Sequence, residues 1–253
     1  MEKIFGIRIK APRIAFDGAT LFETLDFSLP AGQWTCLLGP SGVGKSTLLR
    51  LIAGLATEAG SACISCDDGK PLSGRTAYMG QQDLLLPWLS VIENVTLGRR
   101  LRGEDPKGHE AQSRAKQLLD AVGLKGYEQS LPSKLSGGMR QRAALARTLM
   151  ENRPVVLMDE PFSAVDAITR FRLQELAADL LRDRTVLLVT HDPLEALRLG
   201  DRIHVLSGRP VVISDALLPT GSRPRPAGDP DLLTKQAKLL GQLSAAMEDT
   251  AAA

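Results

Sequence analysis

The stretch that decides the fold is Gly39-Pro40-Ser41-Gly42-Val43-Gly44-Lys45-Ser46, followed by Thr47. It fits the pattern G-x-x-x-x-G-K-[ST], in which the N–H groups of a glycine-rich loop surround phosphate oxygens. Before it, Thr35–Leu38 predicts a short buried strand. After it, leucines at helical spacing predict a helix, which we expect to end near Gly54 and Gly60. A strand, a glycine loop and a helix in this order predict a phosphate-binding loop.

The last residues of this loop carry the chemistry that ATP requires. Lys45 supplies a positive charge for the terminal phosphates, and the helix that follows directs its N-terminus at them. Ser46 offers a hydroxyl to Mg²⁺, which prefers hard oxygen ligands. The loop therefore predicts binding of ATP together with Mg²⁺.

A second segment places two carboxylates at the end of an apolar strand. Val155–Met158 predicts a buried strand, and Asp159 and Glu160 follow it directly, before Pro161. A buried charge at a strand end needs a partner or a metal, so we assign Asp159 to the Mg²⁺ shell. Glu160 points differently and is our candidate general base for the water that attacks the γ-phosphorus.

The third segment is Leu135-Ser136-Gly137-Gly138-Met139-Arg140-Gln141-Arg142, which lies between the other two. Ser136, Gly137 and Gly138 open a predicted helix, Met139–Met150. Such a helix start again offers N–H groups and the positive end of a dipole to phosphate. On its own, the same segment would more often be a simple helix cap.

In this order the three segments resemble the ATPase subunit of an ABC transporter, over about residues 16 to 206. The resemblance implies a P-loop NTPase (RecA-like) fold of the α/β class. It has a parallel-sheet core, an antiparallel β-subdomain and an inserted α-helical subdomain. It also implies a homodimer in which Ser136-Gly137-Gly138 contacts ATP held by the opposite subunit.

The resemblance implies further site residues. His191 matches the histidine that contacts the γ-phosphate and steadies the attacking water. Gln81, with Gln82 as the alternative, matches a glutamine that touches Mg²⁺. Asp166, in Ser163-Ala164-Val165-Asp166, matches a loop at the dimer seam. Phe16 matches an aromatic residue that stacks on adenine, with a core phenylalanine as the alternative.

Apolar runs that alternate with longer helical patterns independently predict an α/β core with parallel strands. We expect an ATPase domain over residues 1–220, with a mostly helical insert at about 82–152. The segment 221–228, rich in glycine and proline, predicts a surface linker. A C-terminal helix follows, which we expect to pack on the domain through one face. The residues of that face are Leu233, Ala237, Leu240, Leu243 and Met247.

Composition excludes several classes of function. Lys plus Arg number 31 against 29 Asp plus Glu, and aromatic residues make up 4%, so neither charge nor stacking surface predicts nucleic acid binding. No apolar run reaches the ~18 residues that a membrane span needs, and the N-terminus lacks a secretory pattern. Cys63 and Cys66 form a C-x-x-C without a second ligand pair, so we expect all three cysteines to be small buried thiols rather than a zinc or redox site.

The segment Leu86-Pro87-Trp88, followed by Val91-Ile92-Glu93-Asn94-Val95, resembles the importer branch for nitrate, taurine, other sulfonates and pyrimidine precursors of thiamine. That branch implies integral-membrane permease subunits and a periplasmic or lipoprotein solute-binding protein. The chain would lie at the cytoplasmic face of the inner membrane, and the apolar surface near Leu85–Leu89 would receive a short permease helix. The alternatives are an efflux or lipoprotein-release ATPase, a soluble ABC protein of DNA repair or translation, and a non-catalytic nucleotide-binding module.

Overall fold

The computed structural model describes residues 4–16, 18–56 and 62–252, with side chains up to residue 250. The chain forms two compact units. The first comprises the described parts of Met1–Thr76, Pro154–Asp159 and Leu181–Ala253, and the second comprises Ala77–Arg153 and Glu160–Leu180. The polypeptide passes from the first unit to the second between Asp159 and Glu160, the two carboxylates singled out above.

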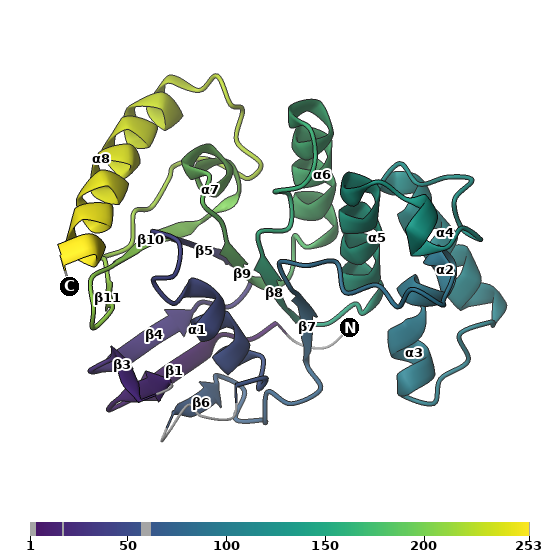
Figure 1. Cartoon of the computed structure of the whole chain (residues 1–253), viewed down its shortest axis with the longest axis horizontal. Helices are drawn as coiled ribbons and strands as arrows, with labels where there is room; N and C mark the ends of the chain where they lie inside the picture. Colours follow the sequence, from purple (N-terminus) through teal and green to yellow (C-terminus); the bar gives the residue numbers. More distant parts are fainter. Residues whose placement is uncertain (1–3, 17, 57–61, 253) are drawn as a thin grey trace. The chain divides into compact units, whose positions relative to one another are not determined.

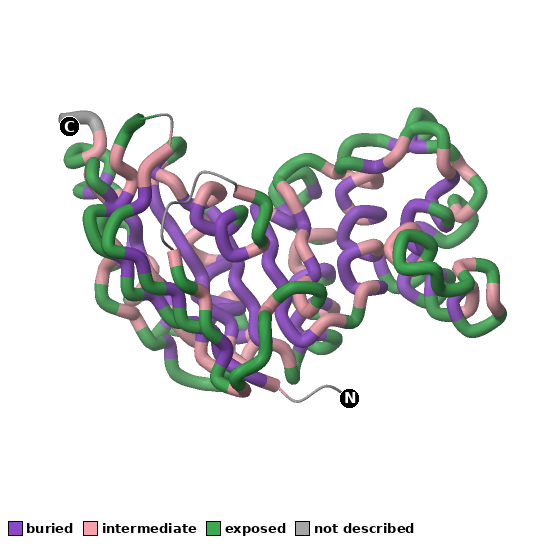
Figure 2. The backbone as a smooth tube through the Cα atoms, turned by 90° about the horizontal axis from the view of Figure 1, so that it is seen from below, coloured by how far each residue is buried: buried purple, intermediate pink, exposed green. Residues whose placement is uncertain are grey.

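The core of the first unit is a sheet with the strand order β11-β10-β5-β9-β8 (Figure 1). Its strands are β5 (Trp34–Leu38), β8 (Val155–Asp159), β9 (Thr185–Val189), β10 (Arg202–Ser207) and β11 (Val212–Ile213). The strands from β10 to β8 pair in parallel, and β11 pairs antiparallel with β10. Every residue of β5, β8 and β9 is buried, as expected of parallel strands covered on both faces (Figure 2).

Helices cover both faces of this sheet. On one face, α1 (Lys45–Ile52) packs against β8 and β9. On the other face, α7 (Pro193–Leu199) packs on β5, and α8 (Pro230–Ala252) packs on α7 and β10 (Figure 1). Helix α1 ends in a Schellman motif, in which Gly54 has a φ of +72° and the N–H of Leu55 donates to Arg50 O. The predicted role of Gly60 lies outside the described residues.

The first unit also contains antiparallel β-structure. One sheet has the order β4-β1-β6, and β2 pairs with β3 in a separate ribbon. The strands are β1 (Ile7–Ala11), β2 (Ile14–Phe16), β3 (Ala19–Phe22), β4 (Leu25–Leu29) and β6 (Cys63–Cys66). In β1 and β4 buried and exposed residues alternate strictly, because one face of this sheet packs on the core and the other meets solvent.

The second unit is mostly helical. Its elements are α2 (Val91–Val95), α3 (Leu97–Leu101), α4 (His109–Ala121), a 3₁₀ turn (Pro132–Lys134), α5 (Gly137–Met150), α6 (Ala167–Leu180) and most of β7 (Thr76–Met79). Helices α2, α4 and α5 pack on one another. Ser90 and Glu93 form a capping box at the start of α2. The α/β fold with a parallel core, antiparallel strands and a helical part is therefore confirmed.

The structure corrects the predicted inner face of the C-terminal helix. Leu233, Leu240 and Met247 of α8 are exposed, whereas the neighbouring Leu232, Leu239 and Ala246 are buried. A shift of one residue turns the face by about 100° around an α-helix. The helix carries apolar residues on both stripes, so its sequence alone does not distinguish the inner one.

Three further expectations differ from the structure. Cys36 and Cys66 are buried, but Cys63 is exposed at the start of an outer strand. Leu85 is buried, whereas Leu84 and Trp88 beside it are exposed. The segment 221–228 has no helix or strand, yet its Arg225 is only 2% exposed, so the segment is anchored to the domain rather than lying free on its surface.

Candidate functional site

The glycine loop connects the buried strand β5 to helix α1 through backbone that favours glycine. Gly39, Gly42 and Gly44 have φ values of +151°, +78° and +113°. A Cβ on Gly39 would lie 2.6 Å from Leu206 O, and one on Gly44 would lie 2.6 Å from Leu21 Cδ1. Gly44 is also the N-cap of α1 and provides no side-chain cap. The first N–H groups of α1 therefore remain suited to an anion, and the loop fits a phosphate group.

Lys45 lies within this loop. It is 7% exposed, and its Nζ donates to Gly39 O at 2.8 Å and to Pro40 O at 2.9 Å. These bonds hold the ammonium group beside the backbone that the glycines shape. A point charge at this place suits the β- and γ-phosphates of a nucleotide.

The carboxyl ends of the parallel strands bring further predicted residues to the same edge of the first unit. Asp159 ends β8, is 1% exposed and lies opposite Val189, the last residue of β9. Because α1 packs on β8 and β9, Ser46 in its first turn lies at this edge of the sheet as well. His191 follows β9 two residues beyond Val189 and is exposed. Ligands of α/β proteins bind at this edge of the sheet.

The donor set fits a magnesium ion held together with phosphates. Ser46 and Asp159 offer a hydroxyl and a carboxylate, both hard oxygen ligands. Within the described ranges, no cluster of three or more His, Cys, Asp or Glu side chains could hold a metal ion by itself. Magnesium typically binds through one or two protein oxygens, substrate phosphates and water, in agreement with this small set.

In the second unit, Glu160 is the centre of a small polar network. Its φ of +49° lies in the left-handed region that residues with a Cβ rarely adopt. Gln81 Nε2 lies 3.4 Å from Glu160 Oε2. Gln141 Nε2 donates to Glu160 O at 3.4 Å and to Pro161 O at 3.3 Å. Strained backbone is found where the surrounding structure enforces it, often at functional sites.

Gln141 is the residue of this network that the sequence analysis did not assign to the site. It is 4% exposed on α5, about one and a half turns beyond Ser136, and reaches the backbone that follows β8. Gln141 belongs to the segment 135–142 that the sequence analysis singles out, so its position could have marked it as a candidate. Only the fold shows that its side chain bonds the carbonyls of Glu160 and Pro161. Gln81 and Gln82 are both exposed, and Gln81 is the one whose side chain approaches Glu160.

The serine–glycine segment begins α5. Ser136 is the N-cap, and its Oγ accepts a hydrogen bond from Met139 N at 3.3 Å. A Cβ on Gly138 would lie 2.9 Å from Ala164 O, so the glycine lets the loop 163–166 approach the helix start. Asp166 in that loop accepts from Thr169 N at 3.0 Å, and this bond holds the pKa of the Asp166 carboxyl below its usual range.

Phe16 lies in the first unit, at the end of β2, and is half-buried. Its partner across the ribbon is Ala19 of β3. The same strand β3 carries Leu21, which touches the space beside Gly44. The ribbon that bears Phe16 therefore lies against the phosphate loop.

A glycine loop between a buried strand and a helix, with a buried aspartate at the end of a parallel strand, defines a P-loop nucleoside triphosphatase. The sequence profile of the ABC transporter family matches residues 22–163. The chain belongs to this family, in which it is an ATP-binding subunit that couples ATP hydrolysis to transport across a membrane.

Relatives of known name cover nearly all of the chain. It is 46% identical over 243 residues to an uncharacterized ABC transporter ATP-binding protein of Haemophilus influenzae, covering 94% of this chain and 98% of that one. It is 43% identical over 245 residues to an aliphatic sulfonates import ATP-binding protein of Pseudomonas savastanoi pv. phaseolicola, covering 96% and 97%.

A solved structure supports the same assignment. A dimeric ATP-binding cassette in a post-hydrolysis state, bound to ADP and Pi, superposes with a TM-score of 0.76 at 27% identity. The match covers 85% of this chain and 100% of that one. Along the described residues of the present chain, no helix is both long enough and apolar enough to cross a membrane.

Proposed function

We propose that this chain is the ATPase subunit of an importer for aliphatic sulfonates. The observation that carries the proposal is the similarity to sulfonate import ATP-binding proteins. At 42–44% identity, it extends over 88–97% of this chain in relatives from Burkholderia, Pseudomonas and Rhodococcus. These relatives favour sulfonates among the ligands that the sequence analysis named.

In this proposal each site residue has one task in ATP hydrolysis. The glycine loop and Lys45 bind the β- and γ-phosphates, and Phe16 stacks on adenine. Ser46 and Asp159 hold Mg²⁺, which neutralises phosphate charge when bound. Glu160 accepts the proton of the water that attacks the γ-phosphorus, and His191 steadies that water and the γ-phosphate.

The network around Glu160 supports its role as base. The left-handed backbone and the two bonds from Gln141 fix the direction in which the side chain leaves the chain. Gln81, which we expect to contact Mg²⁺, meets the same carboxylate. Enzymes of phosphoryl transfer gain most of their rate from positioning and electrostatic stabilisation, and a proton acceptor fixed in advance contributes to the positioning.

We further propose that two copies bind two ATP molecules in their seam, with Ser136, Gly137 and Gly138 of each copy facing the ATP of the other. The dimeric state of the similar cassettes supports this arrangement. Asp166 would lie at the same seam. The subunits would attach to the cytoplasmic face of the membrane through permease subunits. A solute-binding protein would deliver the substrate.

The exposed Leu84 and Trp88, 60% and 71% accessible, form the surface that we expect to receive a permease helix. The loop beneath them is rigid, because the buried Asn94 donates to Leu86 O and Leu89 O and accepts from Leu86 N. A firm loop with apolar side chains on its outside is suited to docking.

The test is reconstitution of the full-length chain in lipid with the permease encoded beside it and the associated solute-binding protein. We expect alkanesulfonate to stimulate ATP hydrolysis and to accumulate inside the vesicles, whereas nitrate does neither. Trp88→Ala should abolish coupling to the permease, while Leu55→Ala, at an exposed leucine outside this surface, should not. Stimulation by nitrate or a pyrimidine, or export instead of uptake, would contradict the proposed substrate class or direction.

A further inference from the structure

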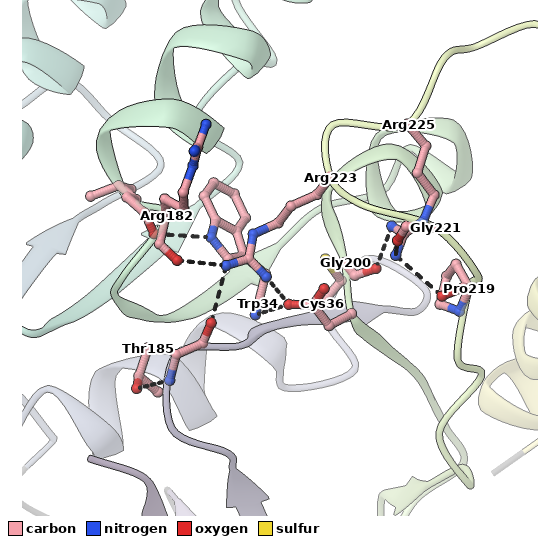
Figure 3. Close-up of polar contacts among 12 residues, drawn as sticks. Trp34, Cys36, Arg182, Thr185, Gly200, Pro219, Gly221, Arg223 and Arg225 are labelled. Atoms are coloured by element: carbon pink, nitrogen blue, oxygen red, sulfur yellow. Dashed lines mark hydrogen bonds and ion pairs between the residues drawn. The ribbon is translucent and has the colours of Figure 1, made fainter. Parts of the chain in front are cut away.

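Arg225 is a buried arginine whose side-chain hydrogen bonds all go to backbone carbonyl oxygens. It belongs to the segment between β11 and α8 and is 2% exposed. A guanidinium group has five N–H donors. They meet the carbonyl oxygens of Leu197, Gly200, Pro219, Thr220 and Gly221 at 2.7 to 3.2 Å (Figure 3). The side chain thereby ties its own loop to the end of helix α7.

The contact with α7 is made where a helix needs partners. The last carbonyl oxygens of an α-helix accept no hydrogen bond from an N–H group of the same helix, and a positive charge is favoured beside them. Arg225 Nη1 bonds Leu197 O at 3.0 Å and Gly200 O at 2.8 Å, and the Arg225 N–H donates to Arg198 O at 3.0 Å. Arg198 Nε returns a bond to Arg225 O at 3.1 Å. Arg225 thus caps the C-terminus of α7 with both side chain and backbone.

The other end of α7 carries His191. Asp192 is the N-cap, and its Oδ1 accepts from Leu194 N at 2.9 Å and from Glu195 N at 3.3 Å. The Asp192 N–H donates to Thr190 Oγ1 at 3.1 Å, directly after β9. The backbone of His191 is therefore held between the end of a buried strand and the first turn of α7.

Helix α7 has seven residues and little stability of its own, so its position depends on its packing against β5 and α8 and on how its two ends are fixed. The helix is only about two turns, or about 10 Å, long, so we expect a displacement at its C-terminal end to reach the N-cap. The capped end and His191 are thus mechanically linked.

We propose that Arg225 is a positioning residue for ATP hydrolysis, which sets the place of the His191 imidazole by fixing the far end of α7. This inference rests on the proposed role of His191 and adds to it a residue of the segment beyond the nucleotide-binding motifs. Arg225 touches none of the phosphate-binding residues among its described contacts, so it should affect turnover and not ATP binding.

Arg223 provides a matched control on the same segment. Its guanidinium pairs with Asp201, bonds Gly32 O at 3.0 Å and Arg182 O at 2.9 Å, and lies over the ring of Trp34 (Figure 3). These contacts fasten the segment to β5, to the turn before β9 and to Asp201, which follows the C-cap of α7, but none of them is to a carbonyl of α7. Loss of Arg223 should reduce stability without moving His191.

The experiment compares full-length Arg225→Met, Arg225→Lys and Arg223→Met with the parent for kcat, KM and thermal midpoint. We expect Arg225→Met to lower kcat about tenfold, since small misplacements of catalytic groups have effects of this size, with KM for ATP near the parental value. Arg225→Lys, which keeps the charge but fewer donors, should recover part of kcat and serves if the methionine variant does not fold. Arg223→Met should lower the thermal midpoint and leave kcat unchanged.

A spectroscopic measurement makes the test independent of activity. The chain has three histidines, so ¹³C-labelled histidine gives signals that can be assigned by substitution. We expect the His191 signal to shift in the Arg225 variants and to stay in place in Arg223→Met. An unmoved His191 signal with parental kcat in both Arg225 variants would overturn the positioning role. Parental turnover of His191→Ala would instead overturn the role of His191 itself.

Discussion

At the scale of single residues, the backbone of Glu160 is strained at the position that carries the proposed general base. A φ of +49° is unfavourable for glutamate by about 1–3 kcal/mol and persists only where neighbours enforce it. Here Gln141 bonds the carbonyls of Glu160 and Pro161. The side chain therefore leaves the backbone in a direction that an ordinary strand end would not give.

We predict that Glu160→Gln keeps ATP binding and lowers the hydrolysis rate by about 10²–10⁴, because glutamine has the shape of glutamate but cannot accept the proton. ATPase assays and nucleotide binding by fluorescence measure the two properties. Glu175→Gln, at an exposed position of α6, is the control and should hydrolyse at the parental rate. Unchanged turnover in Glu160→Gln would remove Glu160 as the base.

The glycine loop permits a prediction that separates strain from steric overlap. Gly42 and Gly44 both have positive φ, but a Cβ on Gly42 meets nothing within 4 Å, whereas one on Gly44 meets Leu21. We expect Gly44→Ala to reduce stability and nucleotide affinity more than Gly42→Ala, whose strain contributes about 1 kcal/mol.

Substitution of Leu21 makes this comparison decisive. Leu21→Ala removes the atoms that a Cβ on Gly44 would overlap, so it should recover part of the loss in Gly44→Ala and none of that in Gly42→Ala. Urea unfolding and ATP titration measure both. Equal losses in the two single variants, unaffected by Leu21→Ala, would show that the overlap with Leu21 contributes to neither the loss of stability nor the loss of affinity.

The residues of the candidate site could be named from the sequence because their spacing follows directly from the fold. A loop between a strand and a helix, or a carboxylate after an apolar run, is visible without coordinates. Gln141 and Arg225 were not assigned roles, because their partners are carbonyl oxygens, which every residue possesses. A side chain that hydrogen-bonds backbone carbonyls therefore produces no recognisable pattern of residue types in the sequence.

At the scale of elements, α8 has two apolar stripes and buries one. Leu239 is fully buried and Leu240 beside it is 52% exposed. We predict that Leu239→Ala lowers the free energy of unfolding by about 2–5 kcal/mol, as for other buried leucines, and that Leu240→Ala changes it by less than about 0.5 kcal/mol. Chemical denaturation of both variants checks this. Equal losses of unfolding free energy in the two variants would instead support the stripe that contains Leu240, which the sequence analysis predicted as the inner face.

The turn after β6 contains an ion pair with a predictable pH dependence. Asp68 and Arg75 are each about 15% exposed, and hydrogen bonds from Arg75 hold the pKa of the Asp68 carboxyl below its ordinary value of 3.8. Because the folded-state pKa is lowered, the pair stabilises the protein above pH 3.8, and this contribution is lost as the pH falls through the folded-state pKa.

Asp68→Asn should therefore destabilise the protein at neutral pH, and its difference from the parent should vanish in strong acid. Urea denaturation as a function of pH measures the difference. Asp26→Asn removes the pair with Arg8, whose side chains are about half exposed, and should have a smaller effect at neutral pH because solvent screens it. A difference for Asp68→Asn that persists in strong acid would exclude the ion pair as its cause.

Most elements were predictable because their apolar periods differ. The parallel strands are short continuous apolar runs, and the helices repeat near 3.6 residues. The face of α8 was not predictable, since two apolar stripes satisfy the same period. The anchoring of 221–228 was hidden by its glycines and prolines, which indicate irregular backbone and say nothing about burial.

At the scale of the whole molecule, the proposed dimer depends on Ser136. We predict that Ser136→Arg prevents ATP-driven association and reduces hydrolysis to near background, since bulk and positive charge would enter the seam. Ser136→Ala removes only the cap at Met139 N, worth about 1 kcal/mol, and should still associate. Light scattering with ATP and ATPase assays compare the two. Parental hydrolysis in Ser136→Arg, or equal loss in both variants, would count against a shared site.

The clamp around Arg225 has one more consequence. Amide oxygens do not titrate, and a guanidinium group stays protonated throughout the range in which proteins function, even though burial lowers the pKa of Arg225. Between a permanently charged donor and amide acceptors, a change of pH alters no protonation state. The hydrogen bonds that fasten the end of α7 should therefore persist from acidic to alkaline surroundings.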